Sequence, residues 1–114
     1  MNSILKNVMK YSKNKVYHNG SYYSKIRLPS KHNKKYLILW EPNHTTNIHG
    51  HDGKNCVFMK VRGDFTDKVY KNDVLVRENN YDLLLHMGEI NDNIGKHSLK
   101  NLSDIIGVSI HIYY

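Results

Sequence analysis

Two histidines separated by a single residue, His49 and His51, are the side chains of this sequence best suited to bind a metal ion. In an extended segment, side chains alternate between two faces with a period of two, so both imidazoles would point to the same side. His97, much later in the chain, is a candidate for a third nitrogen ligand. Three neutral imidazoles would suit a first-row transition metal held at the centre of a small all-β barrel.

The segments that would position these histidines are predicted to be short strands. Runs of β-branched, aromatic and other apolar residues are separated by Gly, Asn, Asp and Pro, which favour turns. The expected strands are residues 21–28, 36–41, 45–51, 55–61, 65–70, 73–77, 81–86, 97–102 and 105–113. The dipeptide Asp52-Gly53 between two of them predicts a β-hairpin of residues 45–51 and 55–61. Short strands at these intervals favour a sandwich or barrel over βαβ units.

The N-terminal residues have a different period. Apolar side chains recur there at helical spacing, as Ile4, Leu5, Val8 and Met9. This pattern predicts one short helix within residues 1–12 that packs on the outside of the fold. We expect the remaining residues 20–114 to form the β-barrel, so that residues 1–114 make one domain, which is the size that 114 residues favour.

Charge and cysteine content narrow the functional classes. The net charge is +7, but the lysines are spread along the chain, which speaks against the clustered basic face of a nucleic-acid-binding protein. Cys56 is the only cysteine, so no intramolecular disulfide can form, and a reducing cytoplasmic location is the expectation. No apolar run approaches the ~18 residues of a membrane span, so we expect no membrane partner.

The histidine motifs resemble those of a known family. The first is His49-x-His51-x4-Cys56-x6-Gly63, and the second is Gly95-x-His97-x3-Asn101. They are similar to the two cupin motifs, with cysteine at the place where most cupins carry a glutamate ligand. Trp40 before the first motif and the ending Ser109-Ile110-His111-Ile112-Tyr113 add a resemblance to the cysteine dioxygenase branch of the thiol dioxygenases. The resemblance runs from about residue 36 to residue 113.

The resemblance implies a fold, a cofactor and a reaction. The fold would be a small cupin, which is a double-stranded β-helix or jelly-roll barrel, and His49, His51 and His97 would bind one Fe(2+). Three neutral ligands leave the ion its full positive charge, which lowers the pKa of an incoming thiol and favours its binding as thiolate. Both atoms of O2 would then end on the sulfur of cysteine or a related small thiol, giving a sulfinic acid.

The resemblance also implies roles for residues around the metal. Cys56 and Tyr113 occupy positions that a thioether bond joins in some members of the family. The Tyr113 hydroxyl would orient oxygen or the substrate, with His111 hydrogen-bonded to it and Trp40 packed behind His111. Such supporting contacts hold a reactive group in a defined geometry.

Substrate binding in this family uses an arginine on an early strand. Its planar guanidinium can meet a carboxylate with two parallel hydrogen bonds. Arg27 is the candidate, but Lys25 lies on the same strand face and nearer the family spacing, with Tyr23 as a neighbour, so the two basic residues remain alternatives. The sequence ends at Tyr114, before the family's C-terminal segment, and we therefore expect a more open pocket.

Three functional hypotheses follow. The first is a thiol dioxygenase whose partners are a small thiol and O2, acting as a monomer or weak homodimer. The second is a non-catalytic cupin that binds zinc, nickel or iron through the same histidines, since imidazole sites accept several divalent metals. The third, a basic module for nucleic acid or an acidic partner, is disfavoured by the even spread of lysine.

Overall fold

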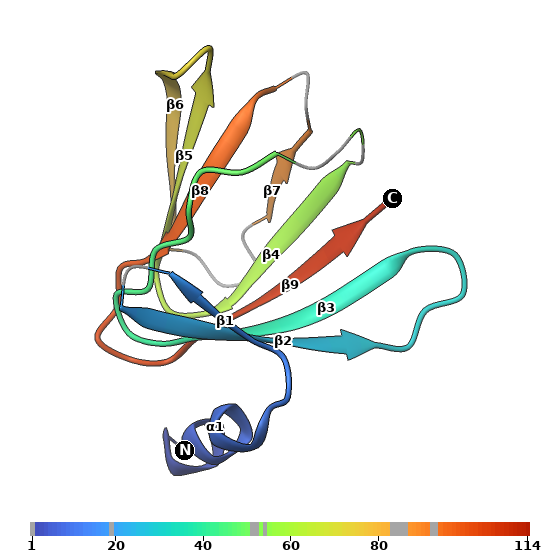
Figure 1. The fold of residues 1–114 in the computed structure, drawn as a ribbon, viewed down its shortest axis with the longest axis vertical. Coiled ribbons are helices and arrows are strands. Elements are labelled where there is room, and N and C mark those ends of the chain that lie inside the picture. Colours follow the sequence, from blue (N-terminus) through green and yellow to red (C-terminus); the bar gives the residue numbers. More distant parts are fainter. Residues whose placement is uncertain (1, 19, 51–52, 54, 83–86, 92–93) are drawn as a thin grey trace.

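The computed structural model describes residues 2–18, 20–50, 53, 55–82, 87–91 and 94–114. These residues form one helix followed by nine strands (Figure 1). They are α1 (Asn2–Tyr11), β1 (Lys15–His18), β2 (Ser21–Leu28), β3 (Lys34–Trp40), β4 (Cys56–Arg62), β5 (Phe65–Lys71), β6 (Val74–Tyr81), β7 (Met87–Ile90), β8 (Lys96–Asn101) and β9 (Gly107–Tyr113). The expectation of an all-β protein with one short N-terminal helix is confirmed.

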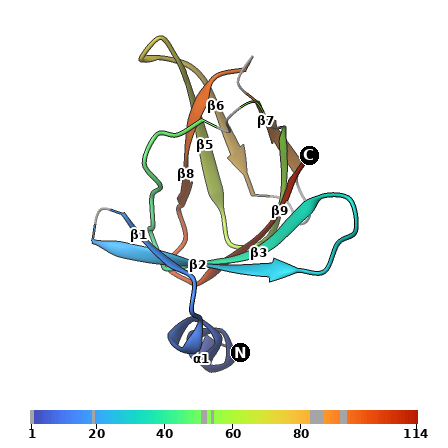
Figure 2. The ribbon, with the colours of Figure 1, turned by 45° about the vertical axis from the view of Figure 1, so that its right-hand side comes forward.

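The strands form two antiparallel sheets. The larger has six strands in the order β1-β2-β3-β9-β4-β7, and the smaller has three in the order β6-β5-β8. Figures 1 and 2 show β5, β6 and β8 on one side of the larger sheet and α1 on the other. The C-terminal strand β9 lies between β3 and β4, so it occupies a central place in the larger sheet.

Aromatic and aliphatic side chains fill the space between the sheets. Alternate residues of each strand point inward, and directly paired residues of neighbouring strands share a face. The buried cluster consists of Ile38, Trp40, Phe58, Phe65, Tyr81 and Leu99. Trp40 is only 1% exposed, as expected for a core residue. This core holds the inner faces of the two sheets together.

The helix covers the outer face of the larger sheet, as its periodicity predicts. Met9 packs in a second buried cluster with Leu39 of β3 and Val108 of β9. Ile4 and Val8, which belong to the apolar pattern that predicted the helix, lie instead on its exposed side. Within the described parts of the chain, no helix has the length and apolar character needed to cross a bilayer.

One expected hairpin is wrong. Residues 45–50 do not pair with β4; they run antiparallel beside β8 through bridges from Thr45 to Lys100 and from His49 to His97. Strand β4 pairs with β7 and β9 instead. A turn dipeptide reports local backbone preference alone, whereas strand pairing is decided by which faces must be buried. The strand β1 was not expected, and part of the expected strand 81–86 lies outside the described residues.

Candidate metal centre

The backbone brings two of the three predicted metal ligands directly together. His49 and His97 exchange two hydrogen bonds, each from the N–H of one to the carbonyl of the other, and both measure 2.9 Å. Residues paired in this way present their side chains on the same face. The centroids of the two imidazole rings are accordingly 4.6 Å apart.

Each of these rings has a fixed acceptor for its Nδ1 proton. Nδ1 of His49 lies 2.8 Å from the carbonyl oxygen of Asn47. Nδ1 of His97 lies 2.9 Å from Oδ1 of Asp67, with His97 2% exposed and Asp67 fully buried. Because carbonyl and carboxylate oxygens accept hydrogen bonds, a proton on Nδ1 of either ring would have an acceptor, and Nε2 would then carry the lone pair. A metal ion would therefore be bound through the Nε2 atoms.

The third predicted ligand, His51, lies outside the described residues. Over the described ranges, no group of three or more His, Cys, Asp or Glu side chains comes together in metal-binding geometry. The two histidines that are described fit a metal site in donor type and in proximity. His49 at the exposed end and the buried His97 would together offer two neutral nitrogen donors.

Three other predicted residues, Cys56, His111 and Tyr113, lie on the inner face of the larger sheet. In the register of β4 and β9, Cys56 is opposite Tyr113 and Phe58 is opposite His111, so all four share the inner face. A small cavity of about 20 Å³ remains between the sheets. Its lining consists of Tyr23, Ile38, Trp40, Thr46, His49, His97, Leu99, His111 and Tyr113.

A buried hydrogen-bonded chain orients His111. The indole Nε1–H of Trp40 donates to Oγ of Ser109 at 2.8 Å, and this oxygen lies 2.9 Å from Nε2 of His111. Nδ1 of His111 faces Sγ of Cys56 at 4.0 Å. Trp40 therefore supports His111 through Ser109 as well as through ring packing, since the two rings are 6.4 Å apart. No role was predicted for Ser109, although its position two residues before His111 on β9 places both side chains on one face.

The side chains of Cys56 and Tyr113 form a hydrogen-bonded pair in the interior. Burial raises the pKa of the Cys56 thiol to about 12, although the hydrogen bond to Tyr113 and the positive charge of Lys25 lower it. Burial also raises the pKa of Tyr113, and the neighbouring thiol adds to this effect. Both groups are therefore protonated at neutral pH, with the thiol beside the phenol.

Of the two basic candidates, Lys25 lies closer to the site. Its Nζ is 4.2 Å from the ring centroid of Tyr36 and 5.1 Å from that of Tyr113. Arg27, two residues further on, is exposed and packs against Tyr36 at 5.5 Å. Cation–π contacts of this kind hold a charged group over an aromatic face. The structure thus places the ammonium of Lys25 beside Tyr113, whereas Arg27 lies nearer the surface.

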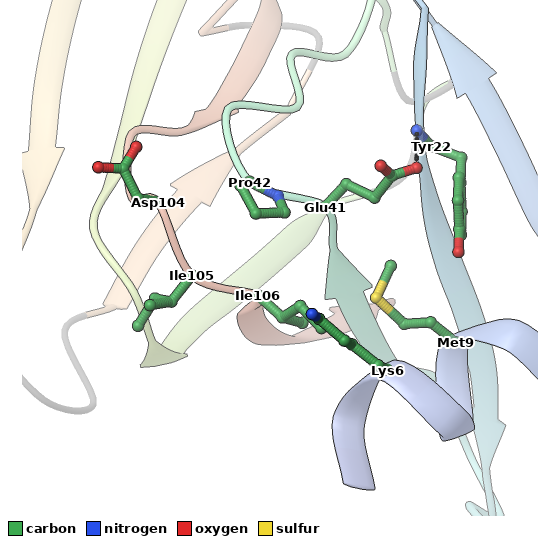
Figure 3. Close-up of a pocket in the computed structure, with 8 residues that line it drawn as sticks. All are labelled: Lys6, Met9, Tyr22, Glu41, Pro42, Asp104, Ile105 and Ile106. Atoms are coloured by element: carbon green, nitrogen blue, oxygen red, sulfur yellow. Dashed lines mark hydrogen bonds between the residues drawn. The ribbon is translucent and has the colours of Figure 1, made fainter. Parts of the chain in front are cut away.

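A larger cavity of about 300 Å³ lies elsewhere, against α1 on the outer side of the larger sheet (Figure 3). Its lining includes Met9 of the helix and Tyr22 of β2, whose backbone N–H donates to Glu41 at 3.0 Å. None of the predicted site residues lines this cavity. The candidate metal centre and this outer cavity are therefore separate features.

Comparison with known proteins gives a family. The family model of cysteine dioxygenase type I matches residues 6–114, which include all of the predicted site residues. Curated proteins gave no significant match to the sequence.

Three solved structures with a similar fold are named as cupins. The Cnp3 cupin domain of Schizosaccharomyces pombe has a TM-score of 0.67 at 8% identity, with 80% of this chain and 59% of that chain covered. The CENP-C cupin domain of Drosophila melanogaster has a TM-score of 0.64 at 16% identity and coverage of 88% and 74%. A sugar phosphate isomerase from a cupin superfamily of Silicibacter pomeroyi has a TM-score of 0.64 at 14% identity and coverage of 80% and 58%. This chain spans less than two thirds of the first and third of these proteins, and the likeness establishes the cupin fold.

Proposed function

The chain belongs to the cysteine dioxygenase type I family, and on that premise we propose that it is an iron(II) thiol dioxygenase. Its substrates would be O2 and cysteine or a related small thiol, and its product the sulfinic acid. The balanced reaction joins one thiol and one O2, and both oxygen atoms end on sulfur. His49, His51 and His97 would hold the iron.

The observation that carries this proposal is the pairing of His49 with His97. Two backbone hydrogen bonds place these residues opposite each other, with both imidazoles beside the cavity that His111 and Tyr113 also line. Two imidazoles that could bind a metal, a phenol and a further imidazole therefore line one small cavity. No other described cavity combines these groups.

Iron(II), when bound, supplies a centre of positive charge that favours the thiolate form of the substrate and activates O2. The residues of the chain would bind and orient the substrate around it. Lys25 would attract the substrate carboxylate as a point charge, without the two-pronged geometry of an arginine. The hydroxyl of Tyr113 would donate a hydrogen bond into the cavity, with Lys25 against its ring and the Cys56 thiol against its side chain.

Cys56 and Tyr113 are also the proposed partners of a thioether crosslink. Their paired positions on β4 and β9 and their side-chain hydrogen bond support this proposal. The bond would join Sγ of Cys56 to the ring carbon beside the hydroxyl of Tyr113, with loss of one hydrogen from the thiol and one from that carbon. O2, a substrate of the proposed reaction, would be the oxidant and would be reduced to hydrogen peroxide. Intact-mass measurement before and after turnover would detect the loss of about two daltons, and Cys56→Ala should abolish that loss.

The decisive experiment is oxygen uptake by protein loaded with iron(II) under anaerobic conditions. Cysteine, 3-mercaptopropionate and cysteamine are offered separately, and the sulfinate product is identified by mass. We expect uptake with at least one carboxylate-bearing thiol and none with the His97→Ala variant. A protein that holds one iron per chain and consumes oxygen with none of the three thiols would refute the proposal.

The alternative is a non-catalytic metal-binding cupin. The volume of the cavity favours it, because about 20 Å³ is the space of roughly one water molecule. Titration of the iron-loaded protein with cysteine separates the two functions. A change in the electronic spectrum of the iron on adding thiol supports the dioxygenase, whereas a spectrum that no thiol changes supports the alternative.

A further inference from the structure

The carboxylate of Asp67 is buried next to a predicted metal ligand, and no sequence motif includes it. Asp67 lies on β5, the central strand of the smaller sheet, between β6 and β8 (Figure 1). It is fully buried, and one of its oxygens lies 2.9 Å from Nδ1 of His97. A charged carboxylate in the interior is costly unless it is paired, so its position calls for an explanation.

The register of the sheet explains how Asp67 reaches two partners. His97 of β8 and Arg77 of β6 are both paired with Val69, from opposite sides of β5. Asp67 lies two residues before Val69 and therefore on the same face of the strand. This diagonal position is within reach of the side chains on both neighbouring strands.

The second oxygen of Asp67 faces Arg77. Nη2 of Arg77 is 3.7 Å from Oδ2, and the same nitrogen donates to the carbonyl of Glu89 at 3.2 Å. No partner among the described residues donates a hydrogen bond to Oδ2. The carboxylate is thus held by one short bond to His97 and one longer charge pair with Arg77. Its hydrogen bonding is directed at the histidine.

We propose that Asp67 is a positioning residue of the metal centre, which holds the Nδ1 proton of His97 and thereby directs Nε2 of this ring toward the metal ion. The inference rests on the proposed function only in that His97 binds a metal. Carboxylate partners of metal-binding histidines fix the tautomer and the ring orientation and raise the basicity of the ligating nitrogen. Arg77 balances the charge of Asp67 at the edge of the smaller sheet.

Asp67→Asn is the sharpest variant, because it preserves shape and removes the charge. An asparagine can turn its NH2 group toward Nδ1, and this would favour the tautomer with the proton on Nε2, where it blocks the metal. The matched control is Asp73→Asn, the same substitution at an exposed position of the turn between β5 and β6. Thermal unfolding of each metal-free variant reports whether the fold is retained.

Two readouts test the role without catalysis. The first is the affinity for cobalt(II), used as the probe ion and followed by its visible absorption. We expect Asp67→Asn to weaken it about 10–100-fold, the usual effect of losing such a partner, and Asp73→Asn to leave it unchanged. A residue with a merely structural role would lower the unfolding temperature and leave the affinity within about twofold, and that result would overturn the proposal.

The second readout is the tautomer of His97 in the metal-free protein, observed by long-range 1H–15N correlation in mildly alkaline buffer. Wild-type protein should carry the proton on Nδ1, and Asp67→Asn should carry it on Nε2. A wild-type spectrum with the proton on Nε2 would overturn the proposal even if the Asn variant did not fold.

His97→Ala separates this inference from the proposed function. If His97→Ala no longer binds cobalt(II) while Asp67→Asn binds it as tightly as wild type, His97 is a metal ligand and the proposed role of Asp67 is wrong. If wild-type protein and His97→Ala bind cobalt(II) equally, His97 is not a ligand, and both proposals fall.

Discussion

Replacing Ser109 by alanine should destabilise the protein far more than the loss of one hydroxyl suggests. Ser109 is 1% exposed and lies between two other buried groups, the indole of Trp40 and the imidazole of His111. Its oxygen accepts from Nε1 of Trp40 at 2.8 Å and lies 2.9 Å from Nε2 of His111. Alanine would therefore leave a buried indole N–H without its acceptor.

The magnitude follows from the number of groups affected. Each lost hydrogen bond contributes about 1 kcal/mol net, and each buried polar group left without a partner costs about 1–3 kcal/mol. Ser109→Ala should thus lower the free energy of unfolding by roughly 2–5 kcal/mol. The control is Ser98→Ala, because the hydroxyl of Ser98 is half-buried and donates only to the carbonyl of Thr46, at 2.8 Å. It should cost about 1 kcal/mol.

Urea unfolding of the metal-free proteins, followed by far-UV circular dichroism, measures both values under the same conditions. A double-mutant cycle with Trp40→Phe isolates the interaction between Trp40 and Ser109. Phenylalanine removes the indole N–H that Ser109→Ala would leave without an acceptor. The coupling energy between Trp40 and Ser109 should be about 1–2 kcal/mol. The reasoning is refuted if Ser109→Ala costs no more than Ser98→Ala, or if its cost is unchanged in the Trp40→Phe background.

Three further predictions concern the thiol, the basic residues and the helix. The pKa of Cys56 is raised by burial from its ordinary value of 9.0 to about 12, so the native thiol stays protonated while the unfolded thiol ionises. The free energy of unfolding should therefore fall as the pH rises from about 9 to about 12. In urea unfolding at a series of pH values, Cys56→Ala should make this fall smaller. The same fall in the variant as in the wild type would show that Cys56 does not cause it. Lys25→Ala should raise KM for a carboxylate-bearing thiol more than Arg27→Ala does, because Lys25 lies against Tyr113. Steady-state oxygen uptake measures both KM values. The opposite order of the two variants would show that Arg27 binds the carboxylate. Met9→Ala should cost about 2–5 kcal/mol in urea unfolding, because Met9 is 2% exposed, whereas Val8→Ala at 42% exposure should have little effect; equal costs would show that α1 does not pack as described.

The local elements were predictable where a single segment contains the whole signal. The apolar spacing of residues 4, 5, 8 and 9 indicates the helix that the structure shows as Asn2–Tyr11. The expected strand 21–28 coincides with β2, since a turn precedes it and Pro29 follows it. Such patterns depend on backbone preferences and on which side chains must be buried, and both can be read along the chain.

Pairing was not predictable in the same way. Asp52-Gly53 predicts a hairpin because of its turn chemistry, but residues 45–50 pair with β8 and β4 pairs with β7 and β9. The preference of two residues for a turn is small compared with the burial of whole strand faces, which involves residues far apart in sequence. No short segment of the sequence shows which of these two effects decides the strand pairing.

Some features of the candidate site could be predicted from the sequence, and others needed the structure. The two histidine motifs, together with Trp40 and the segment 109–113, were enough to predict a family, and the match over residues 6–114 confirms it. The choice between Lys25 and Arg27 as the cation beside Tyr113 needed the structure, because both lie on one face of one strand and only packing against Tyr36 and Tyr113 separates them.

By itself, the sequence determined the residue types that could bind a metal, the all-β class and the family. Only the tertiary structure decided which groups surround His97, since its partner Asp67 lies in the middle of another strand with no motif around it. Ser109 likewise gained a role only when β3 and β9 were brought side by side. A motif consists of residues that are close in the sequence. The hydrogen-bond partners of a buried metal-binding histidine instead come from strands that are distant in the sequence and meet only in the folded protein.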